Sequence, residues 1–327
     1  MADLRTGYMG LELKNPLVAA SCSLTGKLQS IQELVEAGVG AVVLKSLFEE
    51  QMDAETRELE QFTGAEWHAE AYDYVRNMGM ELGPNQYLKL LEEAKKKISV
   101  PVIASLNCVS KAWWPEYAKK LENHGADALE LNISYLTLDA LKAGQDIERV
   151  YSQVVEALTQ VVNIPVAVKI GPHFTNLAGF ARDLQRAGAH ALVLFNRYYQ
   201  IDFDIDALKV KAGNRLSDAA ELSLPLRWVA LLSENAGCQL SSTTGVHTAE
   251  GLIKMLLAGA QTVQVSSAFY KKGTAYASEL ITGLETWMDA KGFAVVEDFR
   301  GKLSRSQSEK PEMLERLQYI KALVGIE

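Results

Sequence analysis

The feature of this sequence that most constrains its fold is a repeat in which a helical pattern ends at glycine and leads into a short apolar run. The four glycines are Gly38, Gly125, Gly188 and Gly259, and the apolar runs after them begin at Ala41, Ala128, Ala191 and Thr262. Glycine suits this place because the residue that follows a helix often adopts a positive φ, which costs glycine nothing. The repeat therefore predicts four helix–strand units.

A second class of strand alternates with the first along the chain. Three of these strands begin after Pro16, Pro101 and Pro165, at a position where a strand tolerates the missing N–H of proline. A fourth candidate covers residues 238–242, and amphipathic helical patterns lie between the strands. Eight such units predict an α/β fold, a (β/α)8 TIM barrel with parallel strands. An open doubly wound sheet is the alternative, but no Gly-x-Gly-x-x-Gly motif follows any strand.

Two connections are too long for simple loops. They follow the second and the sixth strand, at residues 47–83 and 197–225, and insertions of this size in a compact fold are usually binding loops or lids. Residues from about 292 to 327 form a polar connector that leads to a predicted terminal helix. We therefore expect a single barrel domain over residues 1–327, with two insertions and a C-terminal extension.

The charge balance excludes some classes of protein. Lys and Arg total 33 against 41 Asp and Glu, a net charge of −8, which argues against nucleic-acid binding. No uninterrupted apolar window is long enough for a membrane span, and the N-terminus lacks a secretory pattern, so we expect a soluble, cytoplasmic protein. The three cysteines lie far apart, and no histidine spacing is typical of a metal site, so we expect no metal.

Polar residues follow the predicted strands, at the end of a barrel where active sites lie. Lys45 and Lys169 each end an otherwise uncharged apolar run, and a lysine there can stabilise negative charge or form a Schiff base. One such lysine alone could equally be a strand-end residue that reaches solvent. Three strands end at asparagine, namely at Asn107, Asn132 and Asn196. Amides both donate and accept, which suits the imide-like edges of flavins and pyrimidines.

The last two strands are followed by small hydroxyl residues and glycine. These are Thr244 and Gly245 after the seventh strand and Ser266 and Ser267 after the eighth, where barrels often bind phosphate. A helix N-cap at Thr248 would explain part of this composition. Among the histidines, His173 and His247 fall in loops on the same face and remain candidates for the site.

These residues, in this order, resemble the dihydroorotate dehydrogenase family, most closely its soluble class 1 branch. The resemblance runs from Asn15 to about Lys302 and rests on an ordered set of short motifs. They are Asn15-Pro16-Leu17, Ala20-Ser21, Lys45-Ser46, Met78-Gly79, Glu130-Leu131-Asn132-Ile133-Ser134, Val168-Lys169, Asn196, Ser242-Thr243-Thr244-Gly245-Val246 and Leu257-Ala258-Gly259-Ala260.

The resemblance implies an FMN-containing barrel that oxidises dihydroorotate to orotate, a step of pyrimidine biosynthesis, by hydride transfer to flavin N5. The implied cofactor-binding residues are Ala20, Ser21, Lys45, Ser46, Asn107, Asn132, Lys169, Asn196, Thr244, Gly245, Ser266 and Ser267. The implied substrate-binding residues are Asn77, Met78, Gly79, Asn132, Thr137, Asn196 and Arg197. It also implies a homodimer, with fumarate or a protein partner as the electron acceptor.

The sequence departs from the family where substrate chemistry takes place. The family motif Asn-x-Ser-Cys-Pro-Asn supplies its catalytic base from the cysteine, and here the run is Asn132-Ile133-Ser134-Tyr135-Leu136-Thr137. Tyr135 is therefore the candidate base, with Lys45 and Lys169 as the other candidate catalytic residues. An unperturbed tyrosine, with a pKa near 10, needs activation to accept a proton at neutral pH.

Three alternatives stay open from the sequence. The first keeps the flavin and changes the substrate to another cyclic enamide or unsaturated carbonyl compound. The second is a lysine-dependent aldolase or lyase that uses Lys169 or Lys45 as a Schiff base. The third is a flavin protein without turnover that transfers electrons to a partner.

Overall fold

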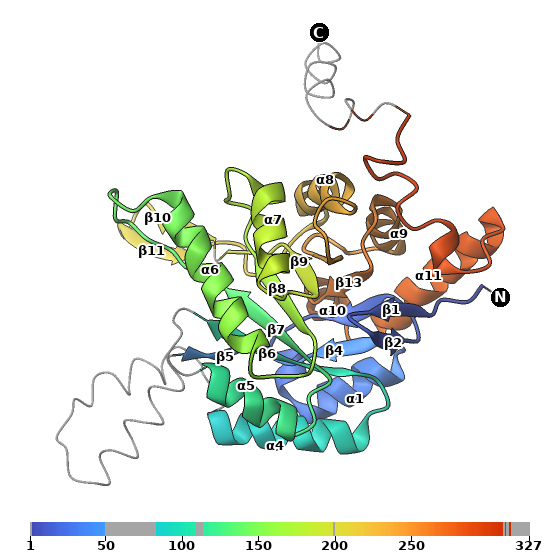
Figure 1. Ribbon diagram of the computed structural model, residues 1–327. Helices are drawn as coiled ribbons and strands as arrows, with labels where there is room; N and C mark the ends of the chain where they lie inside the picture. Colours follow the sequence, from blue (N-terminus) through green and yellow to red (C-terminus); the bar gives the residue numbers. More distant parts are fainter. Residues whose placement is uncertain are drawn as a thin grey trace.

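The computed structural model describes residues 2–49, 83–108, 114–198, 200–309, 311 and 314, and within these the chain forms a closed barrel (Figure 1). The order of the parallel strands is β4, β3, β13, β12, β9, β8, β7, β6, and β6 pairs with β4 to close the ring. Their bounds are β3 Leu17–Ala19, β4 Ala41–Val43, β6 Val102–Cys108, β7 Ala128–Ile133, β8 Val166–Ile170, β9 Ala191–Leu194, β12 Gln239–Thr243 and β13 Thr262–Val265. The predicted (β/α)8 fold and its eight strands are confirmed.

Helices surround this ring and cover the outer faces of the strands (Figure 1). Their bounds are α1 Leu28–Glu36, α4 Pro84–Lys97, α5 Trp114–Asn123, α6 Gly144–Thr159, α7 Leu177–Arg186, α8 Ser223–Leu232, α9 Ala249–Ala258, α10 Ser267–Lys272 and α11 Tyr276–Lys291. Short 3-10 turns lie at η1 Leu24–Gly26, η2 Ala219–Leu222 and η3 Val296–Asp298. Each of the four repeat glycines has a positive φ, between 93° and 110°, as the sequence repeat predicts.

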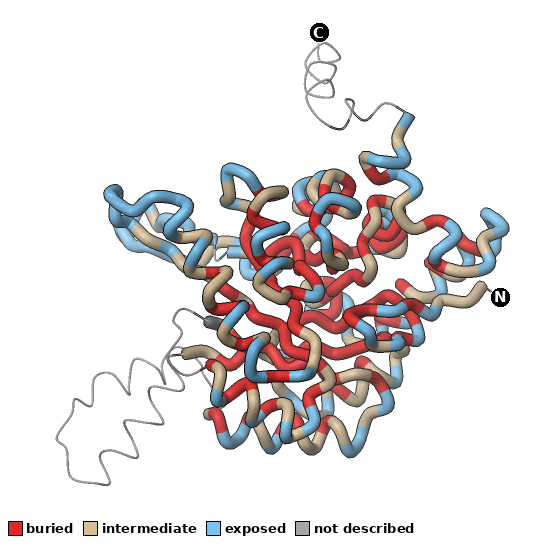
Figure 2. The backbone as a smooth tube through the Cα atoms, in the orientation of Figure 1, coloured by how far each residue is buried: buried red, intermediate tan, exposed pale blue. Residues whose placement is uncertain are grey.

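The strands are buried on both faces, as Figure 2 shows in red. Side chains that point outward pack with the helices, whereas Val18, Ala41, Val43 and Ile103 point inward and form a separate apolar cluster. This two-sided burial explains why the strands read as continuous apolar runs and not as alternating ones.

An N-terminal hairpin closes one end of the barrel, and the sequence analysis did not predict it. Its strands are β1 Thr6–Tyr8 and β2 Leu11–Leu13, and Tyr8 and Leu13 belong to the inner apolar cluster. The Met9 N–H donates to Gln239 Oε1 at 2.6 Å, where β12 begins. The hairpin thus covers the N-terminal ends of the strands and leaves their C-terminal ends for a site.

The two expected insertions differ in how much of them is described. After β4, a short strand β5 (Leu47–Phe48) pairs with β6, and residues 50–82 lie outside the described residues. After β9, the chain forms an antiparallel hairpin of β10 (Ile201–Asp204) and β11 (Lys209–Ala212) that projects from the barrel beside α6 (Figure 1). The expected terminal helix falls almost entirely outside the described residues, so it stays a prediction.

Two kinds of feature are absent from the described part of the chain. Among those residues there is no helix that could span a membrane. Nor do they bring together three or more His, Cys, Asp or Glu side chains in a group that could hold a metal ion.

Candidate active site

A cavity of about 230 Å³ opens at the C-terminal ends of β8, β9, β12 and β13, the end where barrel active sites lie. Nine of the sequence-predicted site residues line it. They are Ala20, Ser21, Lys169, Asn196, Arg197, Thr244, Gly245, Ser266 and Ser267. Residues that lie up to 247 positions apart in sequence are therefore gathered into one cavity by the closure of the barrel.

Hydrogen bonds connect further predicted residues to this cavity. Ser46 N–H donates to Ser21 Oγ at 2.9 Å, and the two hydroxyls lie 3.0 Å apart. Asn196 Nδ2 donates to Asn132 Oδ1 at 2.7 Å, which fixes both amides at the ends of β9 and β7. Asn107 stands beside Asn132 in the register of β6 and β7.

Lys45 lies two residues after the end of β4 and precedes Ser46 in the chain. Its backbone N–H donates to the Thr25 carbonyl at 3.3 Å, and the residue is half-buried. The structure thus places Lys45 at the same end of the barrel as the cavity, beside a residue that is bonded to its lining.

Lys169 is the most buried cation of the cavity lining, with 8% of the residue exposed. Its Nζ lies 3.9 Å from Glu130 Oε1, inside the barrel. Glu130 Oε2 accepts from Gln264 Nε2 at 2.5 Å, and Gln264 itself lines the cavity. Burial raises the pKa of the Glu130 carboxyl, while Lys169 and the Gln264 hydrogen bond oppose that shift.

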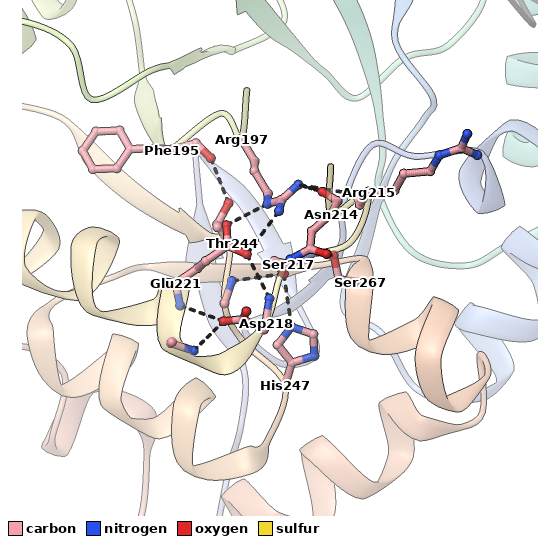
Figure 3. Close-up of polar contacts among 12 residues, drawn as sticks. Phe195, Arg197, Asn214, Arg215, Ser217, Asp218, Glu221, Thr244, His247 and Ser267 are labelled. Atoms are coloured by element: carbon pink, nitrogen blue, oxygen red, sulfur yellow. Dashed lines mark hydrogen bonds and ion pairs between the residues drawn. The ribbon is translucent and has the colours of Figure 1, made fainter. Parts of the chain in front are cut away.

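The insertion after β9 folds back, so that Ser217 lies next to Ser267 and His247 in the cavity region (Figure 3). Ser217 N–H donates to Ser267 Oγ at 3.0 Å, and Gly245 N–H donates to Ser217 Oγ at 3.4 Å. Lys271 Nζ donates to the Ser217 carbonyl at 2.7 Å. Hydroxyls, a backbone N–H and a cation are thus concentrated at the ends of β12 and β13, where the sequence predicted phosphate binding.

His247 lies beneath this part of the cavity, with Nε2 3.1 Å from Ser217 Oγ. Burial lowers the pKa of its imidazole, and Lys271 acts in the same direction. A neutral His247 therefore serves as a hydrogen-bond partner of Ser217. The role that the sequence left open for His247 is a supporting one in this arrangement.

Arg197 is bonded to residues of the insertion, although it also lines the cavity. Its Nε lies 2.7 Å from Glu221 Oε2, and its Nη1 donates to the Asn214 carbonyl at 2.8 Å (Figure 3). Any anionic substrate that Arg197 binds must compete with Glu221. The predicted role of Arg197 in substrate binding stays a prediction.

Tyr135 and Thr137 follow β7 on a loop of residues 134–141. The Tyr135 N–H donates to Tyr151 Oη at 3.1 Å, and Lys142 Nζ donates to Tyr135 Oη at 2.6 Å. That contact raises the pKa of Lys142. Within the described residues, neither Tyr135 nor Thr137 belongs to the cavity lining. Asn77, Met78 and Gly79 lie outside the described residues.

Five residues at or next to the cavity were not among the site residues expected from the sequence: Glu130, Gln264, Arg215, Ser217 and Tyr270. For two of these residues, Glu130 and Gln264, the sequence contained a signal. Glu130 and Gln264 interrupt apolar strands two positions before Asn132 and Ser266, and in a strand that spacing puts side chains on the same face. Arg215 and Ser217 lie in the insertion, where no periodicity indicated their direction.

The sequence of this chain is similar to those of known proteins from one family. The family model described as dihydroorotate dehydrogenase matches residues 3–288. A dihydroorotate dehydrogenase B (NAD(+)) catalytic subunit of Thermoplasma volcanium is 28% identical over 92% of this chain and 98% of the relative. One of Methanosarcina acetivorans is 29% identical over 89% of this chain and 93% of the relative. A protein of Aeropyrum pernix with the provisional name dihydroorotate dehydrogenase A (fumarate) is 28% identical over 93% of this chain.

Proposed function

Since this chain belongs to the dihydroorotate dehydrogenase family of oxidoreductases, we propose that it binds FMN and oxidises dihydroorotate to orotate, a step of pyrimidine biosynthesis. The observation that carries this proposal is the cavity itself. One part of its wall presents Lys169 and Asn196, whose amide is bonded to Asn132, and another presents hydroxyls and Arg215. That combination suits a flat heteroaromatic ring with a phosphate-bearing tail.

The donor set fits FMN in its chemistry. Ser217, Ser266 and Ser267 offer hydroxyls and Arg215 a guanidinium at one end, which are groups that bind phosphate. Lys169 offers a cation at the other end, held in a mostly buried position where its charge acts over a low-dielectric path. Gly245 and Thr244 complete the phosphate end, while Ala20 and Ser21 would contact the ring.

FMN, when bound, supplies the acceptor for the hydride that leaves the substrate. The protein groups bind, orient and stabilise charge. Lys169 would stabilise negative charge on the ring, and the Asn132 and Asn196 amides would orient ring and substrate. Lys45 and Ser46 would also contact the ring.

Removal of the second hydrogen from dihydroorotate requires a base, and the loop residue Tyr135 is our candidate. The Lys142 ammonium donates to Tyr135 Oη and lies 5.2 Å from the centre of its ring. Lys142 thereby orients the phenol oxygen that would accept the proton. Loop 134–141 would have to bring Tyr135 over the cavity when substrate binds.

The electron acceptor and the assembly are also part of the proposal. The relatives' names include NAD(+) and fumarate as acceptors. We propose a cytoplasmic homodimer that passes electrons to fumarate or to a protein partner.

One observation favours a second candidate function. Because Tyr135 and Thr137 lie away from the cavity lining among the described residues, the flavin could serve a substrate other than dihydroorotate. The class that fits is another cyclic enamide or an unsaturated carbonyl compound, reduced or oxidised at the same ring face.

An anaerobic visible spectrum, recorded before and after addition of dihydroorotate, tests the proposal. We expect a flavin band in the purified protein and its bleaching by dihydroorotate. A band that persists would reject dihydroorotate and favour the second candidate. A colourless protein that takes up no FMN and is trapped with a carbonyl compound by borohydride would instead support a Schiff-base lysine.

A further inference from the structure

The barrel interior contains a carboxyl group that the proposed mechanism does not use. Glu130 is completely buried in β7, and burial of a carboxylate is costly unless it is paired and hydrogen-bonded. Glu130 Oε2 accepts the Gln264 hydrogen bond, whereas Oε1 has no hydrogen-bond partner within the described part of the chain. Burial of Glu130 therefore costs stability, and only one of its two oxygens has a hydrogen bond from a described residue. Such a group calls for a functional explanation.

The position of Glu130 relative to the cavity suggests that explanation. In the register of β7 and β8, Asn132 stands beside Lys169 and Glu130 stands beside Ala167. Glu130 therefore lies one inward-facing layer below Lys169, toward the N-terminal end of the barrel. Lys169 lines the cavity, so its ammonium lies between a buried carboxyl group and any ligand that the cavity holds.

Two neighbours favour the ionised form of Glu130. The Gln264 N–H donates to Oε2 at 2.5 Å, and the Lys169 ammonium lies 3.9 Å from Oε1. Both interactions are stronger with a carboxylate than with a carboxylic acid, and they oppose the burial that raises the pKa of Glu130. Because both side chains are buried, the two opposite charges interact more strongly than the same pair would in water.

We propose that Glu130 is a positioning residue that sets how much of the positive charge of Lys169 reaches the bound flavin. The carboxylate holds the ammonium from below and offsets part of its charge. The site then stabilises the reduced, anionic flavin less than an unpaired lysine would. This inference rests on the FMN binding proposed above and deepens it, because it assigns the control of the flavin reduction potential to a residue that does not contact the ring.

The test is the substitution Glu130→Gln, which keeps the shape and can keep the bond to Gln264. The readout is the ratio of the affinities for reduced and oxidised FMN, obtained from the reduction potential of the bound flavin against a reference dye. We expect this ratio to rise by about tenfold in E130Q, a shift of about +30 mV for a two-electron couple.

A double-mutant cycle separates this role from a structural one. Lys169→Gln removes the cation through which Glu130 acts. In the K169Q background, we expect the further change Glu130→Gln to leave the ratio unchanged. Ser242→Ala is the matched control, because Ser242 is equally buried in a barrel strand, and its Oγ has no hydrogen-bond partner among the described residues. We expect that variant to keep the wild-type ratio.

The outcomes distinguish this inference from the proposed function. A wild-type protein that takes up no FMN overturns both. If the wild type binds FMN and E130Q has the same affinity ratio, or if the E130Q effect persists without Lys169, only the present inference falls.

If E130Q fails to fold, a measurement on the wild-type protein still tests the inference. Infrared spectra of the oxidised holoprotein labelled with ¹³C-glutamate report the ionisation of a buried carboxyl. The absence of a protonated-carboxyl band at neutral pH supports the inference, and a band that shifts with the label overturns it.

Discussion

At the scale of single residues, the candidate site combines the residue types that the family resemblance implies with one exception. Lysine, asparagine and serine stand where the family resemblance predicts them, and most of them meet in one cavity. The exception is Tyr135, whose phenol occupies the base position in the sequence but pairs with Lys142 on an exposed loop. The choice of dihydroorotate as the substrate therefore depends most on this side chain.

The substitution Tyr135→Phe removes the phenol oxygen and keeps the ring. We expect reduction of the flavin by dihydroorotate to slow by at least about 100-fold, because general-base catalysis contributes factors of that size. Stopped-flow absorbance under anaerobic conditions measures this rate, and FMN affinity should not change. Lys142→Gln keeps the phenol and removes its cation, so a smaller loss is expected. Unchanged reduction in Y135F would reject Tyr135 as the base.

At the scale of elements, the insertion after β9 packs against the barrel at Gly245. Gly245 has φ +80°, and a Cβ there would lie 2.2 Å from the Leu222 nitrogen and 2.5 Å from its Cα. Leu222 ends η2, the 3-10 turn of the insertion. The insertion can pack against the end of β12 only because residue 245 has no side chain.

The substitution Gly245→Ala should therefore separate the insertion from the barrel. We expect a loss of about 3 kcal/mol in the free energy of unfolding, since strain at a positive φ adds to a clash with backbone. Gly292→Ala is the matched control: Gly292 has φ +73° with nothing within 4 Å of an added Cβ. That variant should lose only about 1 kcal/mol. Urea titration of both variants provides the comparison, and equal losses would contradict the packing argument.

At the scale of the whole molecule, one surface is unusually apolar. Cross-strand pairing in the β10–β11 hairpin puts Ile201, Phe203 and Val210 on one face, while Asp202 and Lys211 pair on the other. Ile201 and Phe203 are each 60% exposed and Val210 66%. Exposed apolar surface of this kind marks an interaction site in a protein that is otherwise well packed.

In the proposed homodimer this apolar face would contact the second subunit. A charged side chain on the face should therefore disrupt the dimer. We expect the wild type to sediment with twice the 36.0 kDa chain mass, and Phe203→Lys to sediment as a monomer. Lys209→Ser, on the opposite face of the hairpin, should remain dimeric. Sedimentation velocity distinguishes these states, and a monomeric wild type would rule out the dimer.

Local chemistry along the chain was enough to predict the barrel and to name several of the residues that line its cavity. Glycines after helices, prolines before strands and apolar runs of the right length are signals of neighbouring residues, and the active end of a parallel barrel follows from strand direction alone. For this reason Lys169, Asn196, Thr244 and Ser266 could be assigned from their places at strand ends.

The long-range contacts of the site and of the N-terminal hairpin depend on closure of the barrel, and no local signal in the sequence predicts them. The Glu130–Gln264 pair joins residues 134 positions apart, and Ser217 reaches Ser267 from an insertion without periodicity. The N-terminal hairpin fills the barrel end by contacts with residues more than two hundred positions away, such as Met9 with Gln239. Such contacts depend on strand register and on the path of loops in space, because side chains become neighbours only when the ring is complete.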